Sequence, residues 1–188
     1  PYFTGRLIRG VKNTSSPEWL RRELESIGIR SISSLVDITN YFAFDWGRPL
    51  HVFDADLLKG NLTVREAELG ESFCALDGKT YVLDKGMTVI ADELGIVALA
   101  GIMGGERTGC TEATETVFLE SAFFEAAQVA RTGQKLGILS DARFRFERGV
   151  DPLSTLPGLH AATEMILKLC GGEVSEPLER GAPPPSRK

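Results

Sequence analysis

The 188-residue sequence contains only three cysteines and two histidines. Cys74, Cys110 and Cys170 lie far apart and are odd in number, which argues against a disulfide framework and favours a reducing compartment. No spacing of cysteine and histidine typical of a zinc site is present. The sequence therefore predicts no metal site, and it offers no Cys-His pair for nucleophilic catalysis.

Long apolar runs and an excess of positive charge are also missing. No apolar run approaches membrane-spanning length, so we expect no contact with a membrane. The formal net charge is −5, whereas a protein that holds nucleic acid by bulk electrostatics has a basic field. The chain could still admit a short single-stranded end that another module delivers. It opens at Pro1 and closes on the linker-like GAPPPSRK, which indicates a piece of a longer protein.

Short apolar segments separated by turn residues predict an α+β fold, because helices flank a strand-rich middle. Trp19 is expected in the core on one face of the first helix, and residues 140–152 are expected to be extended. The last long helix is expected to start at Pro152, after an Asp151 cap, and to end at Gly171, or to begin near residue 155 instead, because Pro157 falls inside it. Strands are expected at residues 3–11, 62–67, 72–77, 80–84, 88–92, 96–101, 116–124 and 172–176, and helices at 15–28, 33–47, 124–137 and 155–172.

Glu120 is the most informative side chain. In the strand expected at residues 116–124, alternation places Glu120 on the same face as Phe118 and Ala122. If that strand is internal, Glu120 is a carboxyl group among apolar neighbours, which is costly unless a donor meets it. Two alternatives stay open. Glu120 is either part of a structural ion pair or an exposed edge, or it accepts a hydrogen bond from a ligand.

Two further side chains are candidates for chemistry. His51, in GRPLHVFDAD, is either a half-buried structural histidine or a group that polarises a carbonyl or positions a water. Ser140 opens a charge-rich segment after a turn at Gly137, where side chains often line a cleft. No Ser-His-Asp order is present, so any catalysis is expected to proceed through a positioned water.

Four glycines fall within nine positions of ALAGIMGGERTG, residues 98–109. The phosphate-binding patterns fail here, because Glu106 and Met103 stand where the Walker and dinucleotide motifs need glycine. Because these glycines have no Cβ atoms, the segment is predicted either to bend sharply or to let a strand or a ligand approach its backbone closely.

Seven motifs, in this order, resemble the beta subunit of bacterial phenylalanyl-tRNA synthetase over residues 3–175. They are VDITNY, GRPLHVFDAD, LDGK, VIAD, ALAGIMGG, VFLESAFF and DARFRFERGVDP. The chain is similar to the central B3/B4 region, the editing module of that subunit. This resemblance implies an α+β, three-layer B3/B4-type fold with a β-sandwich-like core flanked by helices. We expect one domain at residues 1–178, or two interleaved lobes, and a flexible proline-rich linker at 179–188.

The resemblance implies hydrolysis of tyrosine that has been attached mistakenly to tRNA(Phe). The parent enzyme ligates phenylalanine to tRNA(Phe) with ATP and Mg²⁺, and no cofactor is expected in this chain. An apolar phenylalanine pocket rejects an added hydroxyl only weakly, by roughly a hundredfold, whereas a second site that hydrogen-bonds the hydroxyl discriminates better. The implied substrate-binding residues are Glu120, Gly101, Gly104 and Ala142, and the implied catalytic residues are His51 and Ser140.

Implied partners are the 3′ end of tRNA(Phe), the alpha subunit and the remaining beta-subunit domains of a cytoplasmic alpha2-beta2 heterotetramer. The sequence departs from the family pattern at Ser140, where threonine is usual, at Arg48, where glutamine is common, and at Arg143, where a small polar residue is common. Arg48 is expected to add charge near the tRNA end. The general base stays open. Alternative functions are a scaffold module that does not edit and a free-standing deacylase or amino-acid sensor.

Overall fold

The structure, a computed structural model, describes residues 1–184 and divides into two compact units. Unit 1 comprises residues 1–55, 110–123 and the chain from residue 151 onward, and unit 2 comprises residues 56–109 and 124–150. Helices and antiparallel strands are mixed along the chain, so the predicted α+β class is confirmed. The end of the expected linker, residues 185–188, lies outside the described residues.

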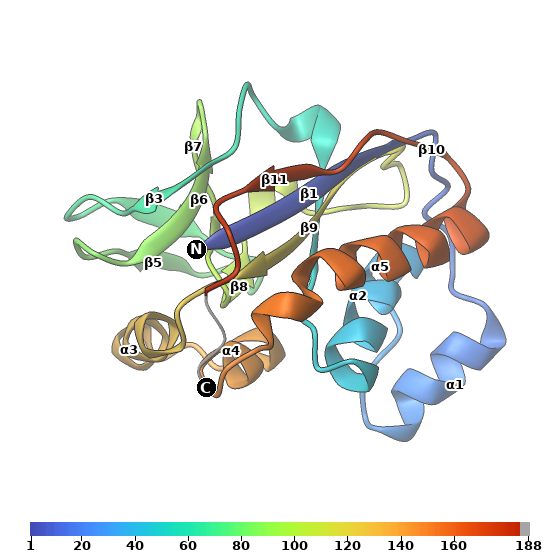
Figure 1. The fold of residues 1–188 in the computed structure, drawn as a ribbon, viewed down its shortest axis with the longest axis horizontal. Coiled ribbons are helices and arrows are strands. Elements are labelled where there is room, and N and C mark those ends of the chain that lie inside the picture. The colour runs from blue at the N-terminus through green and yellow to red at the C-terminus, as the bar shows by residue number, and fades with distance from the viewer. Residues whose placement is uncertain (185–188) are drawn as a thin grey trace. The chain divides into compact units, whose positions relative to one another are not determined.

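In the described part of unit 1, five strands form one antiparallel sheet with the order β10-β1-β9-β2, and β11 also pairs with β1 (Figure 1). The long strands β1 and β9 are held together by eight residue pairs, from Tyr2↔Phe123 to Arg9↔Thr116. Strand β9 therefore lies inside the sheet, with β1 on one side and β2 on the other. The strands are β1 (Tyr2–Arg9), β2 (His51–Asp54), β9 (Thr116–Phe123), β10 (Glu173–Val174) and β11 (Leu178–Arg180).

One face of this sheet packs on helices. Ile8, Val117 and Leu119 are buried against apolar side chains of the helices, among them Leu159 and Ile166. In Figure 1, α2 and α5 lie on the same side of β1 and β9. The opposite face carries the residues with the other parity, including Glu120. The helices of unit 1 are α1 (Glu18–Ser26), α2 (Ser34–Asp45), the 3₁₀ turn η3 (Pro152–Ser154) and α5 (Thr155–Cys170).

The sequence pattern predicted the ends of the helices better than it predicted which side chains are buried. Helix α5 begins at Thr155, the later of the two expected starts, so that Pro157 lies in its first turn, where proline is tolerated. The earlier start at Pro152 was wrong for α5, because Asp151 caps the separate turn η3. Trp19 was expected in the core, and this was wrong: its side chain is 46% exposed. The buried face of α1 is formed by Leu20 and Leu24 instead.

Unit 2 contains, within the described residues, a four-stranded sheet with the order β3-β6-β7-β8 and a separate hairpin, β4-β5. Its strands are β3 (Thr63–Glu66), β4 (Ser72–Cys74), β5 (Thr80–Val82), β6 (Thr88–Asp92), β7 (Gly95–Leu99) and β8 (Met103–Gly104). Its helices are α3 (Ala126–Leu136), α4 (Asp141–Phe146) and η2 (Glu106–Thr108), while η1 (Ala55–Leu57) begins at the boundary. The extended conformation expected for residues 140–152 was wrong, because Ser140 caps a short helix there.

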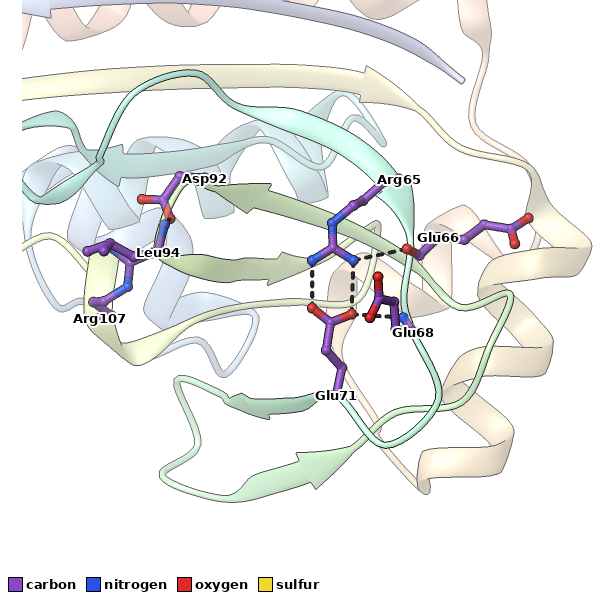
Figure 2. Close-up of polar contacts among 7 residues, drawn as sticks. All are labelled: Arg65, Glu66, Glu68, Glu71, Asp92, Leu94 and Arg107. Carbon is purple, nitrogen blue, oxygen red and sulfur yellow. Dashed lines mark hydrogen bonds and ion pairs between the residues drawn. The ribbon is translucent and has the colours of Figure 1, made fainter.

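Paired charges fix the loops of unit 2. Both terminal nitrogens of Arg65 donate to the Glu71 carboxylate, at 2.9 and 2.6 Å, and the Glu68 amide donates to it at 2.8 Å (Figure 2). The hydrogen bonds from Arg65 hold the pKa of Glu71 at about 2. Arg107 donates to Asp92 at 2.7 Å. Each of the charged side chains in these two pairs, Arg65–Glu71 and Arg107–Asp92, therefore already has an oppositely charged partner within unit 2.

Candidate functional site

The six site residues expected from the sequence fall into two groups. Each group lies within one unit, and the members of each group are brought together by backbone geometry. Unit 1 carries His51 and Glu120, and unit 2 carries Gly101, Gly104, Ser140 and Ala142.

Glu120 lies at the middle of β9, opposite Gly5 on β1 and His51 on β2. Its side chain is only 6% exposed, and its Oε2 atom has no hydrogen-bond partner among the described residues. Burial raises the pKa of Glu120 to about 8. Because β9 is internal and the Glu120 side chain is buried, the exposed-edge alternative is wrong. The pKa of Glu120 is shifted by burial without a charged partner in the described chain, which counts against the structural ion pair.

His51 is the first residue of β2 and is registered with Glu120. Directly opposed residues of an antiparallel pair project to the same face, with Cβ atoms roughly 4.5–5.5 Å apart. The side chain of His51 is half-buried as a whole, but its Nε2 atom is buried and lacks a hydrogen-bond partner within residues 1–184. Burial lowers the pKa of His51 to about 4. At pH 7 His51 is therefore neutral and Glu120 is mostly protonated, and one buried side-chain atom of each has no hydrogen-bond partner among the described residues.

Aromatic rings surround this pair on the same face of the sheet. The Phe53 ring meets His51 edge-on, with centroids 4.4 Å apart and an interplanar angle of 79°. Phe118 stacks with Phe3 at 6.4 Å and 11°. A Cβ atom at Gly5 would lie 2.1 Å from the Phe118 ring, so only glycine fits there. This apolar surrounding is the physical cause of the shifted pKa values.

Sequence reasoning missed the role of Gly5. The only available signal was a glycine inside an expected strand, which often marks a close approach of another group. The partner of Gly5 could not be named, because Phe118 is more than a hundred residues away in the chain and reaches Gly5 only through sheet pairing.

The glycine-rich turn of unit 2 connects β7 to β8. Gly101 has a φ of +70°, a left-handed conformation that favours glycine. A Cβ atom at Gly101 would approach Val129, Phe124 and Phe146 to 3.1–3.2 Å. Gly104, in β8, pairs with Ala98 of β7. The close neighbours of Gly101 are thus side chains of the same unit.

Ser140 belongs to the same local cluster as this turn. Its hydroxyl donates to the carbonyl oxygen of Ile102 at 2.6 Å and accepts the amide of Arg143 at 3.0 Å. It is therefore the N-cap of α4. Ala142 follows in the first turn of that helix and is half-buried. The structure brings Ser140 together with the glycine-rich turn, a proximity that the sequence alone could not show.

Arg48 does not supply surface charge. Its side chain is 0% exposed, so any charge that it adds near the tRNA end is a buried one. Its guanidinium donates to the Ala122 carbonyl at 2.7 Å and to Ser154 Oγ at 3.0 Å, and also to the Asp151 carbonyl. Burial lowers the pKa of Arg48 to about 10. Arg48 thus ties the end of β9 to the turn η3 that precedes α5.

Arg143 is also engaged in structure. Its Nε atom donates to Glu147 at 2.9 Å and its terminal nitrogen donates to the Ile138 carbonyl at 2.5 Å. Its stem lies against Gly133 of α3, where a Cβ atom would come within 2.4 Å of it. The departure from the family pattern at this position therefore comes with a defined packing partner.

No cluster of three or more histidine, cysteine, aspartate or glutamate side chains in residues 1–184 is placed to hold a metal ion. Among the same residues, none of the helices combines the length and the apolar character needed to span a membrane.

Comparisons with known proteins give a consistent family. The model of the B3/4 domain matches residues 1–171. The phenylalanine–tRNA ligase beta subunit of Paramagnetospirillum magneticum is 61% identical over 188 residues, which is 100% of this chain and 24% of that protein. That of Ruegeria pomeroyi is 59% identical over 184 residues, which is 98% of this chain and 23% of that protein. This chain spans about a quarter of the length of these relatives.

A solved N-terminal fragment of the phenylalanyl-tRNA synthetase beta subunit from Pyrococcus horikoshii aligns with a TM-score of 0.48 and 16% identity. The alignment covers 71% of this chain and 45% of that one.

Proposed function

The chain belongs to the B3/4 domain family, and from this premise we propose that it is the editing module of a phenylalanyl-tRNA ligase beta subunit. In this proposal it hydrolyses the ester that joins a mistakenly attached tyrosine to tRNA(Phe). The names of the relatives support the parent enzyme, which would ligate phenylalanine to tRNA(Phe) with ATP and Mg²⁺.

The observation that carries the proposal is the buried carboxyl of Glu120, whose Oε2 atom has no partner among the described residues. An unpaired polar group inside a sheet destabilises the protein, so its presence favours a ligand that completes it. The phenol of tyrosine can do so, whereas phenylalanine leaves the carboxyl unpaired. A site of this kind discriminates strongly against the analogue that lacks the hydroxyl.

The protonation state of Glu120 fits a neutral ligand group. With a pKa of about 8, the carboxyl is mostly protonated at pH 7. A protonated carboxyl both donates and accepts, and so does a phenol, so the two groups can form a pair without burying a charge. Binding tyrosine in this way avoids the large cost of a desolvated carboxylate.

His51 is proposed to orient the attacking water or the ester. Its Nε2 atom is buried without a partner, and its lowered pKa keeps the imidazole neutral at pH 7. A neutral imidazole can accept a hydrogen bond from a water and so orient it. For unit 2, we propose from the family resemblance that Gly101, Gly104 and Ala142 contact the substrate and that Ser140 serves the hydrolysis.

The remaining parts of the proposal concern the parent protein. The partners would be the 3′ end of tRNA(Phe), the alpha subunit and the other beta-subunit domains, in a cytoplasmic alpha2-beta2 assembly. The chain itself is proposed as one domain over residues 1–178, or as two interleaved lobes. ATP and Mg²⁺ would serve ligation elsewhere in the parent enzyme.

An NMR titration of this chain with tyrosine and with phenylalanine tests the proposal. We expect shifts that are selective for tyrosine, lost in Glu120→Ala and retained in Glu112→Ala, which removes an exposed carboxylate in the loop before β9. Hydrolysis of Tyr-tRNA(Phe) should be lost in the same variant. Equal or absent binding of the two amino acids by the folded chain would overturn the role of Glu120 and favour a scaffold module.

A further inference from the structure

We propose that Ser140 is a positioning residue, which fixes the glycine-rich turn at residues 99–104 rather than activating a water. This inference rests on the proposed function, because it states how Ser140 would contribute to the editing reaction. It concerns contacts that all lie within unit 2.

The hydroxyl of Ser140 already takes part in two hydrogen bonds. A serine hydroxyl has one proton and two lone pairs. The proton is donated to the Ile102 carbonyl at 2.6 Å, and one lone pair accepts the Arg143 amide at 3.0 Å. A hydroxyl activates a water by taking a proton from it, and a neutral serine hydroxyl is a poor base; with the Arg143 amide already on one lone pair, only the other lone pair is left for other contacts.

The turn needs this donor. Gly101 adopts a left-handed conformation, and the Ile102 amide closes the turn by donating to the Leu99 carbonyl at 3.0 Å. The carbonyl of Ile102 lies outside the strand ladder, where an unmatched backbone acceptor destabilises the fold. Ser140 supplies the hydrogen bond that the ladder does not.

A second contact joins the same helix to the same turn. Phe146, the last residue of α4, lies close to Gly101, where an added Cβ atom would be 3.2 Å from its ring. Phe146 also packs on Phe124, with ring centroids 5.4 Å apart. The glycine-rich turn is thus contacted by the N-cap of α4 and by the last residue of that helix.

Arg143 holds the N-cap in place from the other side. Its guanidinium donates to the Ile138 carbonyl two residues before Ser140, and its stem fills the space that Gly133 leaves open. The Arg143 amide is the one that Ser140 caps. Side-chain and backbone contacts therefore fix Ser140 relative to both α3 and α4.

Three substitutions separate the two hydrogen bonds of Ser140. Ser140→Thr keeps the donor and the acceptor. Ser140→Asp keeps an acceptor for the Arg143 amide, and aspartate is a good N-cap, but its carboxylate has no proton for the Ile102 carbonyl. Ser140→Ala removes both bonds. Each variant is compared with the unchanged chain in the NMR titration with tyrosine and in hydrolysis of Tyr-tRNA(Phe).

We expect Ser140→Thr to bind tyrosine like the unchanged chain. Ser140→Asp and Ser140→Ala should bind it about five- to tenfold more weakly, the loss typical of one hydrogen bond. The NMR shifts caused by these two substitutions should include residues 101–104. If Ser140→Ala keeps its affinity for tyrosine and loses only the rate of hydrolysis, Ser140 acts on water and the inference is wrong.

Hydrogen exchange distinguishes failure of this inference from failure of the proposed function. The amides of Ile102 and Gly105 donate to Leu99 and Val97 within the same turn region. Their exchange should quicken in Ser140→Ala and Ser140→Asp and stay slow in Ser140→Thr, whether or not the chain binds tyrosine. Unchanged exchange in all three variants would overturn the positioning role. Absence of tyrosine binding by the unchanged chain would overturn only the proposed function.

Discussion

Glu120→Gln is expected to raise the free energy of unfolding at neutral pH, because glutamine never carries the charge that burial penalises. Burial raises the pKa of Glu120 from 4.5 to about 8. Above pH 4.5 the unfolded chain loses this proton, so folding requires the carboxyl to take it up again. Each pKa unit corresponds to about 1.36 kcal/mol, so the stability lost is about 1 kcal/mol at pH 5 and about 3 kcal/mol at pH 7.

The direction follows from the raised pKa of the folded state. Below pH 4.5 Glu120 is protonated in both the folded and the unfolded chain, so the stability of the protonated state is fully present. That stability is lost progressively as the pH rises toward 8. Glutamine does not titrate, so the gap in the free energy of unfolding between Glu120→Gln and the unchanged chain should widen as the pH rises. His51 has the opposite dependence: its pKa falls from 6.5 to about 4, so its contribution is lost as the pH falls below 6.5. Both proteins contain His51, and its effect cancels in the difference.

Urea unfolding of the two proteins at a series of pH values between 5 and 8 measures this gap. Glu112→Gln is the matched control, because it changes an exposed glutamate and should show no gap that grows with pH. A gap for Glu120→Gln that stays constant over the series would refute the reasoning, since it would mean that Glu120 titrates alike in the folded and unfolded chain.

Two further predictions concern packing in unit 1. Arg48→Met should lower the free energy of unfolding by about 2–3 kcal/mol, because it leaves the buried carbonyl of Ala122 without a donor; Arg48→Lys should lose less, and equal stability of all three proteins in urea would contradict this. Gly5→Ala should lose about 1–3 kcal/mol, because its Cβ atom would meet the Phe118 ring at 2.1 Å. Adding Phe118→Leu should recover part of that loss, and a double variant whose two losses simply add would count against the contact.

Local sequence pattern located most of the secondary structure. Period-two alternation identified the strand around Glu120, and turn glycines and prolines marked its neighbours and the start of α5 at Thr155. The pattern was less reliable for burial. Trp19 lies on a helix whose buried face is formed by Leu20 and Leu24, and the helix at 141–146 was missed because the capping role of Ser140 resembles that of any polar loop residue.

The sequence by itself determined the family, through seven ordered motifs, and the presence of a carboxyl among apolar residues in a strand. Tertiary structure alone decided that β9 is internal, that His51 stands opposite Glu120, and that Gly5 faces the Phe118 ring. It also decided that Arg48 is buried and that Ser140 bonds to the glycine-rich turn. The physical reason is that helix and strand periods are local, whereas sheet register and desolvation depend on residues far apart in the chain.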